Sequence, residues 1–184
     1  MSIFETIKKR RTIVPALFNN ESVKRSDIEQ LLEAANWAPT HRRTEPWRFK
    51  VVQGQVKDDL GLFLAKKYKV IAKKFSRVKQ AKIMEKMNQS SAVILICMQR
   101  DPNESLPEWE EIAATAMSVQ NLWLMATELG LGGYWSSPKM INYMHEFLFL
   151  EKGERCLGLF YLGHFEGERP ERVPGDIADK VEWL

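Results

Sequence analysis

Cysteine and histidine are scarce in this chain of 184 residues, which has two cysteines and three histidines. Cys97 and Cys156 lie far apart in the sequence, in no spacing that is typical of metal ligands. Their separation argues against a disulfide scaffold, a zinc site and a Cys-x-x-Cys redox pair. We therefore expect a reduced, cytoplasmic setting and no bound metal.

Long apolar runs are also missing from the sequence. No stretch approaches the roughly 20 apolar residues that a membrane helix needs. The N-terminal segment 1–11 lacks the apolar core of a signal peptide. We expect a soluble protein that is not exported and does not act on a membrane.

Familiar catalytic and nucleotide-binding motifs do not occur either. There is no Gly-x-Ser-x-Gly elbow, no P-loop and no Gly-x-Gly-x-x-Gly fingerprint. The histidines, at positions 41, 145 and 164, form no cluster with carboxylates in metal-ligand spacing. If the chain is an enzyme, we expect a bound cofactor to supply the difficult chemistry.

The composition that remains is that of an ordinary globular protein, with 45% apolar and 28% charged residues. A chain of this length suits one domain, residues 1–184. Its polar end, from about 166 to 184, looks like an arm that needs a surface to lie on.

Hydrophobic periodicity and turn signals predict where the helices and strands of this chain lie. Capping-box patterns at Ser2 with Glu5, and at Ser26 with Glu29, mark two helix starts. We expect further helices over 56–87 with one or two breaks, over 108–129, and from Pro138. The expected strands are 47–53, 92–98 and 155–163. Alternating strands with an excess of helices predict a three-layer α/β or α+β fold.

Two basic or polar segments could carry function. Arg10, Arg11 and Thr12 could hold a phosphate, although basic residues also close many helices and complement the helix dipole. In the loop 38–49, Thr40 and His41 could hydrogen-bond a polar heterocycle. His41 could equally be a surface imidazole.

The segment 130–137 contains three glycines in four positions, which would let its backbone approach a ligand closely. Trp135 could stack on a ring system, and Ser136 and Ser137 could donate hydrogen bonds. The alternative is an ordinary helix stop followed by a turn.

The stretch 66–86 has nine Lys or Arg residues against Glu85 alone, a local charge of nine minus one, or +8. A solvated helical face is the plainest interpretation. Attraction of phosphorylated pyridine nucleotides is a second. A nucleic-acid surface is disfavoured, since aromatic residues other than Tyr68 and Phe75 are few there.

In their order and spacing, these segments resemble the nitroreductase family of flavin enzymes, and more narrowly its short bacterial subfamily. The resemblance spans essentially the whole chain. It covers Arg10-Arg11-Thr12 at the end of the first helix, the loop and strand 38–49, the long helix 109–130, Gly-Gly-Tyr-Trp-Ser-Ser at 132–137, and the strand 157–163.

The resemblance implies an α+β fold with a central mixed or antiparallel sheet, working as an intertwined homodimer with FMN at the subunit interface. The arm 166–184 would then pack on the partner. FMN N5 would take hydride from NADH or NADPH and pass electrons to a nitroaromatic, a quinone or another activated acceptor in a ping-pong cycle. No side chain is then required as a catalytic residue.

The resemblance also implies roles for particular residues. For FMN binding, these are Arg10, Arg11, Thr12, Trp37, Pro39, Thr40, His41, Trp135, Ser136 and Ser137, with Pro39 to His41 contributed by the other subunit. For the path of the nicotinamide nucleotide and substrate, they are Met125, Ala126, Thr127, Glu128, Leu129 and Gly130. Further candidates on the phosphate side are His164, Arg169 and Arg172.

One position departs from the family pattern, because Val14 stands where many members have a second arginine. Polar contact with the flavin would be thinner as a result. Two other functions therefore stay open: a flavin-binding sensor or carrier without turnover, and a polyanion-binding protein that uses the stretch 66–86. We expect no nucleic-acid partner.

Overall fold

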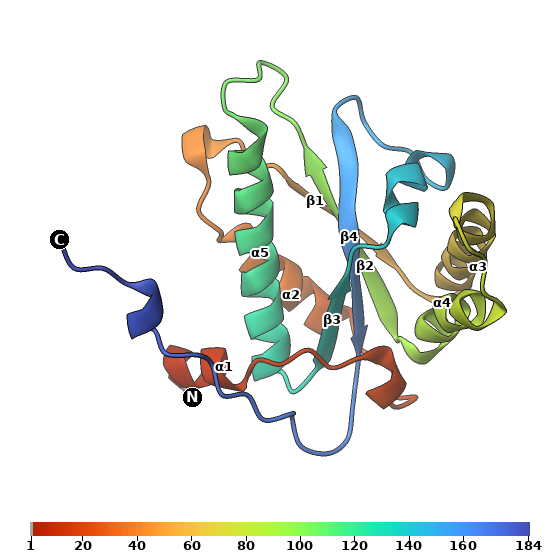
Figure 1. The fold of residues 1–184 in the computed structure, drawn as a ribbon, viewed down its shortest axis with the longest axis horizontal. Coiled ribbons are helices and arrows are strands. Elements are labelled where there is room, and N and C mark those ends of the chain that lie inside the picture. The colour runs from red at the N-terminus through yellow and green to blue at the C-terminus, as the bar shows by residue number, and fades with distance from the viewer. Residues whose placement is uncertain (1) are drawn as a thin grey trace.

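A four-stranded antiparallel sheet forms the centre of the computed structural model, which describes residues 2–184 (Figure 1). Its strands are β1 (Trp47–Val52), β2 (Ala92–Gln99), β3 (Gly132–Ser136) and β4 (Glu154–Gly163), in the order β1-β2-β4-β3. The apolar strand β2 is central and buried on both faces, as its unbroken apolar run predicts.

Helices cover both faces of this sheet. On one face lie α2 (Arg25–Asn36) and α5 (Glu108–Glu128), which share a core with β2 and β4. The other face is covered by α3 (Gly54–Ile71), α4 (Arg77–Gln89) and the 3₁₀ segment η3 (Lys139–Glu146). The structure confirms the three-layer α+β fold, with a sheet that is wholly antiparallel.

Local signals predicted most helix starts, though not all. The helix α1 (Ile3–Lys9) begins as expected, since Ser2 Oγ accepts a hydrogen bond from the Glu5 backbone N–H at 3.2 Å. The predicted cap at Ser26 is wrong, because α2 begins at Arg25 after an N-cap residue whose side chain makes no capping bond. Tertiary contact sets this start: the N–H of buried Val23 donates to Ser91 Oγ at 2.7 Å.

The sequence predicted no strand at 132–136 and an ordinary helix after Pro138. The first segment is the edge strand β3, whose pairing runs from Gly132 opposite Gly163 to Ser136 opposite Leu159. The Phe18 ring lies against both Gly132 and Gly163, where any side chain would collide with it. The glycines therefore serve close packing and strand pairing, a role that turn chemistry alone does not reveal.

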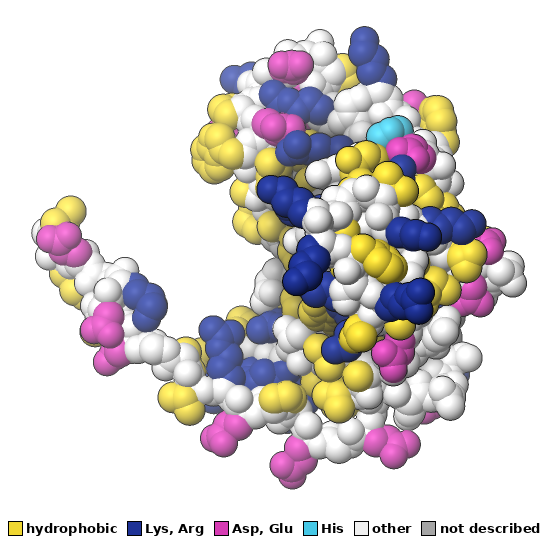
Figure 2. Space-filling model, turned by 45° about the vertical axis from the view of Figure 1, so that its right-hand side comes forward, with side chains coloured by type: hydrophobic (Ala, Val, Ile, Leu, Met, Phe, Trp, Pro, Cys, Tyr) yellow, Lys and Arg dark blue, Asp and Glu magenta, His cyan; other side chains and the backbone are white. Residues whose placement is uncertain are grey.

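Shorter 3₁₀ turns complete the fold at η1 (Pro15–Leu17), η2 (His41–Arg43) and η4 (Ala178–Lys180). After β4 the chain continues as an arm, residues 166–184. Its first part lies against the end of α1 and the segment after α5, and its last part stands away from the body (Figures 1 and 2). It exposes apolar side chains, among them Val173, Ile177 and Trp183. Across residues 2–184, none of the helices has the length and apolarity needed to cross a membrane.

Candidate functional site

Four arginines gather where the arm leaves the body: Arg10, Arg11, Arg169 and Arg172. We call them the arginine cluster. Arg11 Nε donates to the backbone oxygen of Pro170 at 2.6 Å, which joins the end of α1 to the arm. Arg169 Nη2 donates to the Leu131 oxygen at 3.2 Å, which joins the arm to the segment between α5 and β3.

The cluster is strongly electropositive. Burial, followed by the charges of Arg172 and Arg11, lowers the pKa of Arg10. Burial and the Arg11 charge likewise lower the pKa of Arg169. Within the described residues 2–184, no carboxylate forms an ion pair with any of the four, and Arg169 Nη1 is buried without a hydrogen-bond partner. Uncompensated guanidinium groups at this density fit a multiply charged anion such as a phosphate ester.

Arg10 connects the cluster to the sheet. Its guanidinium lies 4.6 Å from the ring centroid of Trp123, and that indole packs edge-on against Phe160 of β4. The Ile13 N–H donates to the Gly133 oxygen at 3.0 Å, so the segment after α1 runs beside β3. Exposed Thr12 lies between these contacts. Sequence reasoning missed Trp123, whose helical spacing indicated only a core residue.

Trp135, Ser136 and Ser137 follow at the far end of β3. The indole of Trp135 packs on Gly158 of β4, in the core between the sheet and α5. Its Nε1 is buried without a hydrogen-bond partner. The ring therefore packs against the edge of the hydrophobic core. Its predicted stacking on a flavin stays a prediction. Ser136 is half-buried and Ser137 is exposed, so the solvent exposure of the chain increases after Trp135.

A second group of predicted residues lies in the loop after α2. Trp37 is 79% exposed, and its Nε1 donates to Glu33 Oε1 at 2.9 Å. Thr40 Oγ1 accepts from the Glu45 N–H at 3.2 Å. His41 Nδ1 lies 2.6 Å from Glu110 Oε2, at the start of α5.

This loop has an unusual backbone. Arg42, Arg43 and Glu45 have φ values of 51°, 55° and 41°, in the left-handed region that residues with a side chain seldom adopt. A loop held in such a conformation suggests a functional constraint. It borders a cavity of about 510 Å³ whose other lining includes Trp109 and Met117 of α5.

One chain does not bring the two groups of residues together. His41 is tied to Glu110 near the start of α5, whereas Arg169 is tied to the Thr127 oxygen at its end. At a rise of 1.5 Å per residue, the 17 positions from Glu110 to Thr127 span about 26 Å. The arginine cluster with β3, and Pro39 to His41, are two candidate half-sites toward opposite ends of α5 (Figure 1). Trp37 lies apart from Pro39 to His41, beside Met125 and Glu128 in the C-terminal half of that helix.

The residues predicted for the nicotinamide path divide in two. Met125 and Glu128 line a cavity of about 440 Å³ beside Trp37, and Thr6 Oγ1 donates to Glu128 Oε2 at 3.0 Å. The others do not reach that cavity: Ala126 and Thr127 are buried, Leu129 packs on the core, and Gly130 ends the helix with a φ of 76°.

Three weaker candidates also have definite places. Arg169 and Arg172 belong to the arginine cluster. His164 does not, because its Nδ1 faces Glu21 Oε2 at 3.9 Å on the other side of the first 3₁₀ turn. The departing residue, Val14, is exposed beside that turn.

The basic stretch 66–86 forms the face of α3 and α4, where Figure 2 shows Lys and Arg side chains gathered. A groove of about 690 Å³ between the two helices is lined by apolar Leu62 and Met84 and by Lys66, Lys69 and Arg77. This face lies across the sheet from α2 and α5, so it takes no part in either half-site.

Comparison with known proteins gives one consistent result. The model of the nitroreductase family matches residues 7–164. A Bacillus subtilis (strain 168) protein named "Putative NAD(P)H nitroreductase YfhC" is 32% identical over 170 residues, which are 91% of this chain and 86% of that protein.

Solved structures agree in fold. A nitroreductase-like family protein from Bacillus cereus has a TM-score of 0.83 and 28% identity, and the match covers 100% of this chain and 96% of that one. A structure from Desulfovibrio desulfuricans, titled a "putative nitroreductase in complex with fmn", has a TM-score of 0.76 at 21% identity and covers 100% and 97% of the two chains.

Proposed function

We propose that this chain, which belongs to the nitroreductase family, is an FMN-dependent oxidoreductase that takes hydride from NADH or NADPH. Its acceptor would be a nitroaromatic, a quinone or another activated unsaturated compound. The observation that carries the proposal is the arginine cluster, a set of guanidinium groups that no carboxylate within residues 2–184 neutralises. The FMN of the Desulfovibrio structure and the name of the Bacillus subtilis relative support it.

The residues present fit FMN at its charged end. FMN carries a phosphate monoester, and no carboxylate within residues 2–184 pairs with the arginine cluster and would compete for that phosphate. Arg10 is held over Trp123, so its guanidinium is oriented before any ligand arrives. When bound, FMN supplies a group that accepts and donates hydride, which no side chain of this protein can do.

The side chains of this protein would bind FMN and orient its ring. The arginine cluster would hold the phosphate, and Thr12 beside it would hydrogen-bond the pyrimidine side. The exposed backbone at Ser136 and Ser137 would donate toward the ring, supported by the Trp135 indole packed behind it. A ring held between these groups would exclude water from one face.

A twofold-symmetric homodimer would complete each site. With α5 antiparallel to its copy and the axis near Met117, the partner's His41 would lie beside this chain's arginine cluster. Exposed apolar side chains line that face, including Trp37, Trp109 and Met117. Apolar area of this extent indicates an interface, and the arm 166–184 has apolar side chains to lay on a second subunit.

The test is a visible spectrum of the purified protein, recorded before and after anaerobic addition of NADH or NADPH. An FMN spectrum that bleaches supports the proposal. A flavin spectrum that neither nucleotide bleaches favours the sensor or carrier without turnover. A protein that stays colourless after FMN is added and excess is removed overturns both.

A second candidate function rests on the basic face of α3 and α4. Its groove combines an apolar floor with Lys66, Lys69 and Arg77, which suits a polyanion or an acidic partner. The measurement is retardation of DNA or RNA at several salt concentrations. A steep salt dependence that disappears when four of the lysines become glutamate supports this function, and no retardation at low salt excludes it.

A further inference from the structure

The two cysteines, so distant in the sequence, face each other across the middle of the sheet. Cys97 of β2 and Cys156 of β4 are register partners. Facing residues of antiparallel strands have Cα atoms about 4.5 to 5.5 Å apart. A disulfide needs a Cα separation of about 4.4 to 6.8 Å, a range that includes the usual separation of such facing residues.

A β-bulge creates this pairing. Along β4, Gly158 pairs with Ile96 and Cys156 pairs with Cys97, so Leu157 is an extra residue without a partner on β2. Strict alternation would place Cys156 on the opposite face of the sheet from Leu159. The bulge restores it to the face that Cys97 and Leu159 share, and re-aiming a side chain is a known use of bulges.

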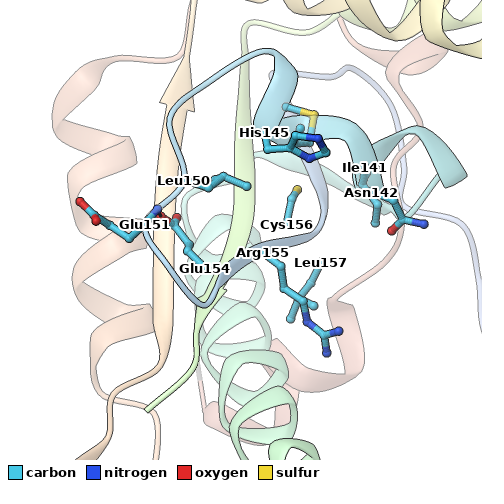
Figure 3. Close-up of a pocket in the computed structure, with 10 residues that line it drawn as sticks. Ile141, Asn142, His145, Leu150, Glu151, Glu154, Arg155, Cys156 and Leu157 are labelled. Atoms are coloured by element: carbon cyan, nitrogen blue, oxygen red, sulfur yellow. Dashed lines mark hydrogen bonds between the residues drawn. The ribbon is translucent and has the colours of Figure 1, made fainter. Parts of the chain in front are cut away.

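The two thiols are not equivalent. Cys97 is completely buried, whereas Cys156 lines a cavity of about 520 Å³ that opens between η3 and the start of β4. Figure 3 shows the Cys156 sulfur directed into this cavity toward His145, while the Arg155 guanidinium points away. A small reagent can therefore reach Cys156, whereas Cys97 has no exposed surface and does not line this cavity.

The pKa shifts of the two thiols also differ in direction. Contact with the Cys156 side chain, together with burial, raises the pKa of Cys97, and the same contact lowers the pKa of Cys156, whose thiol donates to the Gly158 oxygen at 3.4 Å. Lys50 adds a positive charge nearby, and its Nζ lies 2.6 Å from buried Glu154, which acts in the opposite sense. Cys156 is thus the thiol that ionises first, and the thiolate is the reactive form.

We propose that Cys97 and Cys156 form a reversible oxidation site for small hydroperoxides, with Cys156 as the attacking thiol and Cys97 as the resolving thiol. The Cys156 sulfur attacks one peroxide oxygen, so an S–O bond forms, the O–O bond breaks, and an alcohol or water leaves with the displaced proton. Cys97 then attacks the Cys156 sulfenic acid, forming the disulfide and releasing water. The two thiols lose two electrons and the hydroperoxide gains them.

The pairing has a chemical consequence for the protein. A sulfenic acid with no neighbouring thiol is open to irreversible further oxidation, and Cys97 stands in contact to prevent it. The bond would be reversible because a thiol reductant that enters the cavity beside Cys156 can attack that sulfur and release Cys97.

The experiment treats the folded protein, supplied with FMN and no nicotinamide nucleotide, with hydrogen peroxide. The reaction is quenched by alkylation under denaturing conditions, and masses are recorded before and after reduction. We expect loss of two hydrogens, loss of both alkylation sites, and a linked pair of tryptic peptides, 87–100 with 156–172, that dithiothreitol separates. Two free thiols after peroxide, or a bond between two chains, would overturn the proposal.

Two matched variants assign the roles. In Cys97→Ala, dimedone should trap a sulfenic acid at Cys156, because its resolving partner is gone. In Cys156→Ala, oxidation of Cys97 should be at least about tenfold slower than that of Cys156 in the first variant, since Cys97 is buried and remains a thiol. Equal rates would contradict the assignment. These masses do not depend on flavin binding, so failure here is separate from failure of the proposed function.

Discussion

His41 Nδ1 lies 2.6 Å from Oε2 of Glu110, and this contact fastens the loop after α2 to the first turn of α5. The arginine cluster is fastened to the other end of the same helix through Arg169. About 26 Å of helix therefore separates two groups of residues that the proposed FMN site would combine. One chain alone does not bring these two groups together. In the proposed twofold-symmetric dimer, each group would lie beside the other group of the second subunit.

Mixed dimers test that arrangement directly. His41→Ala and Arg172→Ala, expressed with different tags, should each lose FMN on dialysis as homodimers. The purified heterodimer should retain about one FMN per dimer, because one site would carry both changes and the other neither. FMN is counted by its absorbance after denaturation. Sites built within one chain would leave one defect in each, and no FMN would be retained.

The arginine cluster should determine FMN affinity. Arg172→Ala removes a charge that influences half-buried Arg10, and loss of a charge-assisted bond of about 1.5 to 3 kcal/mol weakens binding by about 10- to 100-fold. Fluorescence titration with FMN measures the change. Arg155→Ala is the control, since that arginine pairs with Glu108 at 3.0 Å away from the cluster. Equal FMN affinities for both variants and the parent would show that this cluster does not bind the phosphate.

Gly158 leaves room for the Trp135 indole. A methyl group at position 158 would collide with the indole and with the Ser136 oxygen, so Gly158→Ala should lower the free energy of unfolding by about 1 to 3 kcal/mol. Urea denaturation measures the loss. Gly175→Ala in the arm is the matched control and should be neutral, because only a lysine end lies near it. An unchanged midpoint for Gly158→Ala would show that the indole is not held there.

Two glutamates of the first turn of α5 should differ sharply in their contribution to stability. Glu111 is fully buried, pairs with Arg100 and accepts from the Asp101 N–H at 2.8 Å. Glu111→Ala would leave the Arg100 charge and the Asp101 N–H without this partner, and it should destabilise the fold clearly more than Glu108→Ala. Glu108→Ala breaks only an exposed pair with Arg155 and should cost at most about 1 kcal/mol. Similar losses in thermal and urea unfolding would contradict this difference.

Asp101 predicts an acid-sensitive contribution to stability. The Ser105 hydroxyl and N–H donate to its carboxylate, which lowers the pKa of Asp101 from its ordinary value of 3.8. Its stabilising effect is therefore complete above about pH 4 and is lost as the pH falls through the lower folded-state value. Stability measured from about pH 5 to about pH 2 should fall less steeply in Ser105→Ala than in the parent. Parallel curves would rule out this contribution.

Much of the fold was predictable because its signals are local. The run 92–98 predicted a central strand, and β2 occupies it; the apolar spacing of 108–129 predicted the long helix α5. Trp47 was predicted to be core, and it is 6% exposed with its Nε1 bonded to Asn36 Oδ1 at 3.1 Å. Such patterns depend on the pleat and the helical repeat, which neighbouring residues alone establish.

The candidate site was predictable as a set of segments and not as a geometry. Arg169 and Arg172 looked like weaker candidates, because nothing in a polar arm predicts that Arg11 will bind its backbone. Trp135 was predicted to stack on a ring system, because nothing near it in the sequence shows that Gly158, twenty-three positions away, makes room for its indole in the core.

The sequence by itself determined the order and type of most elements, though not of β3 or η3, as well as the family and the basic and aromatic segments from which a site could be built. Tertiary structure alone decided which of them meet. It put His41 and Arg169 at opposite ends of α5, and one extra residue, Leu157, turned Cys156 to face Cys97. The reason is physical: periodicity orients a side chain relative to its own strand or helix, whereas register, bulges and packing between distant elements decide what that side chain touches.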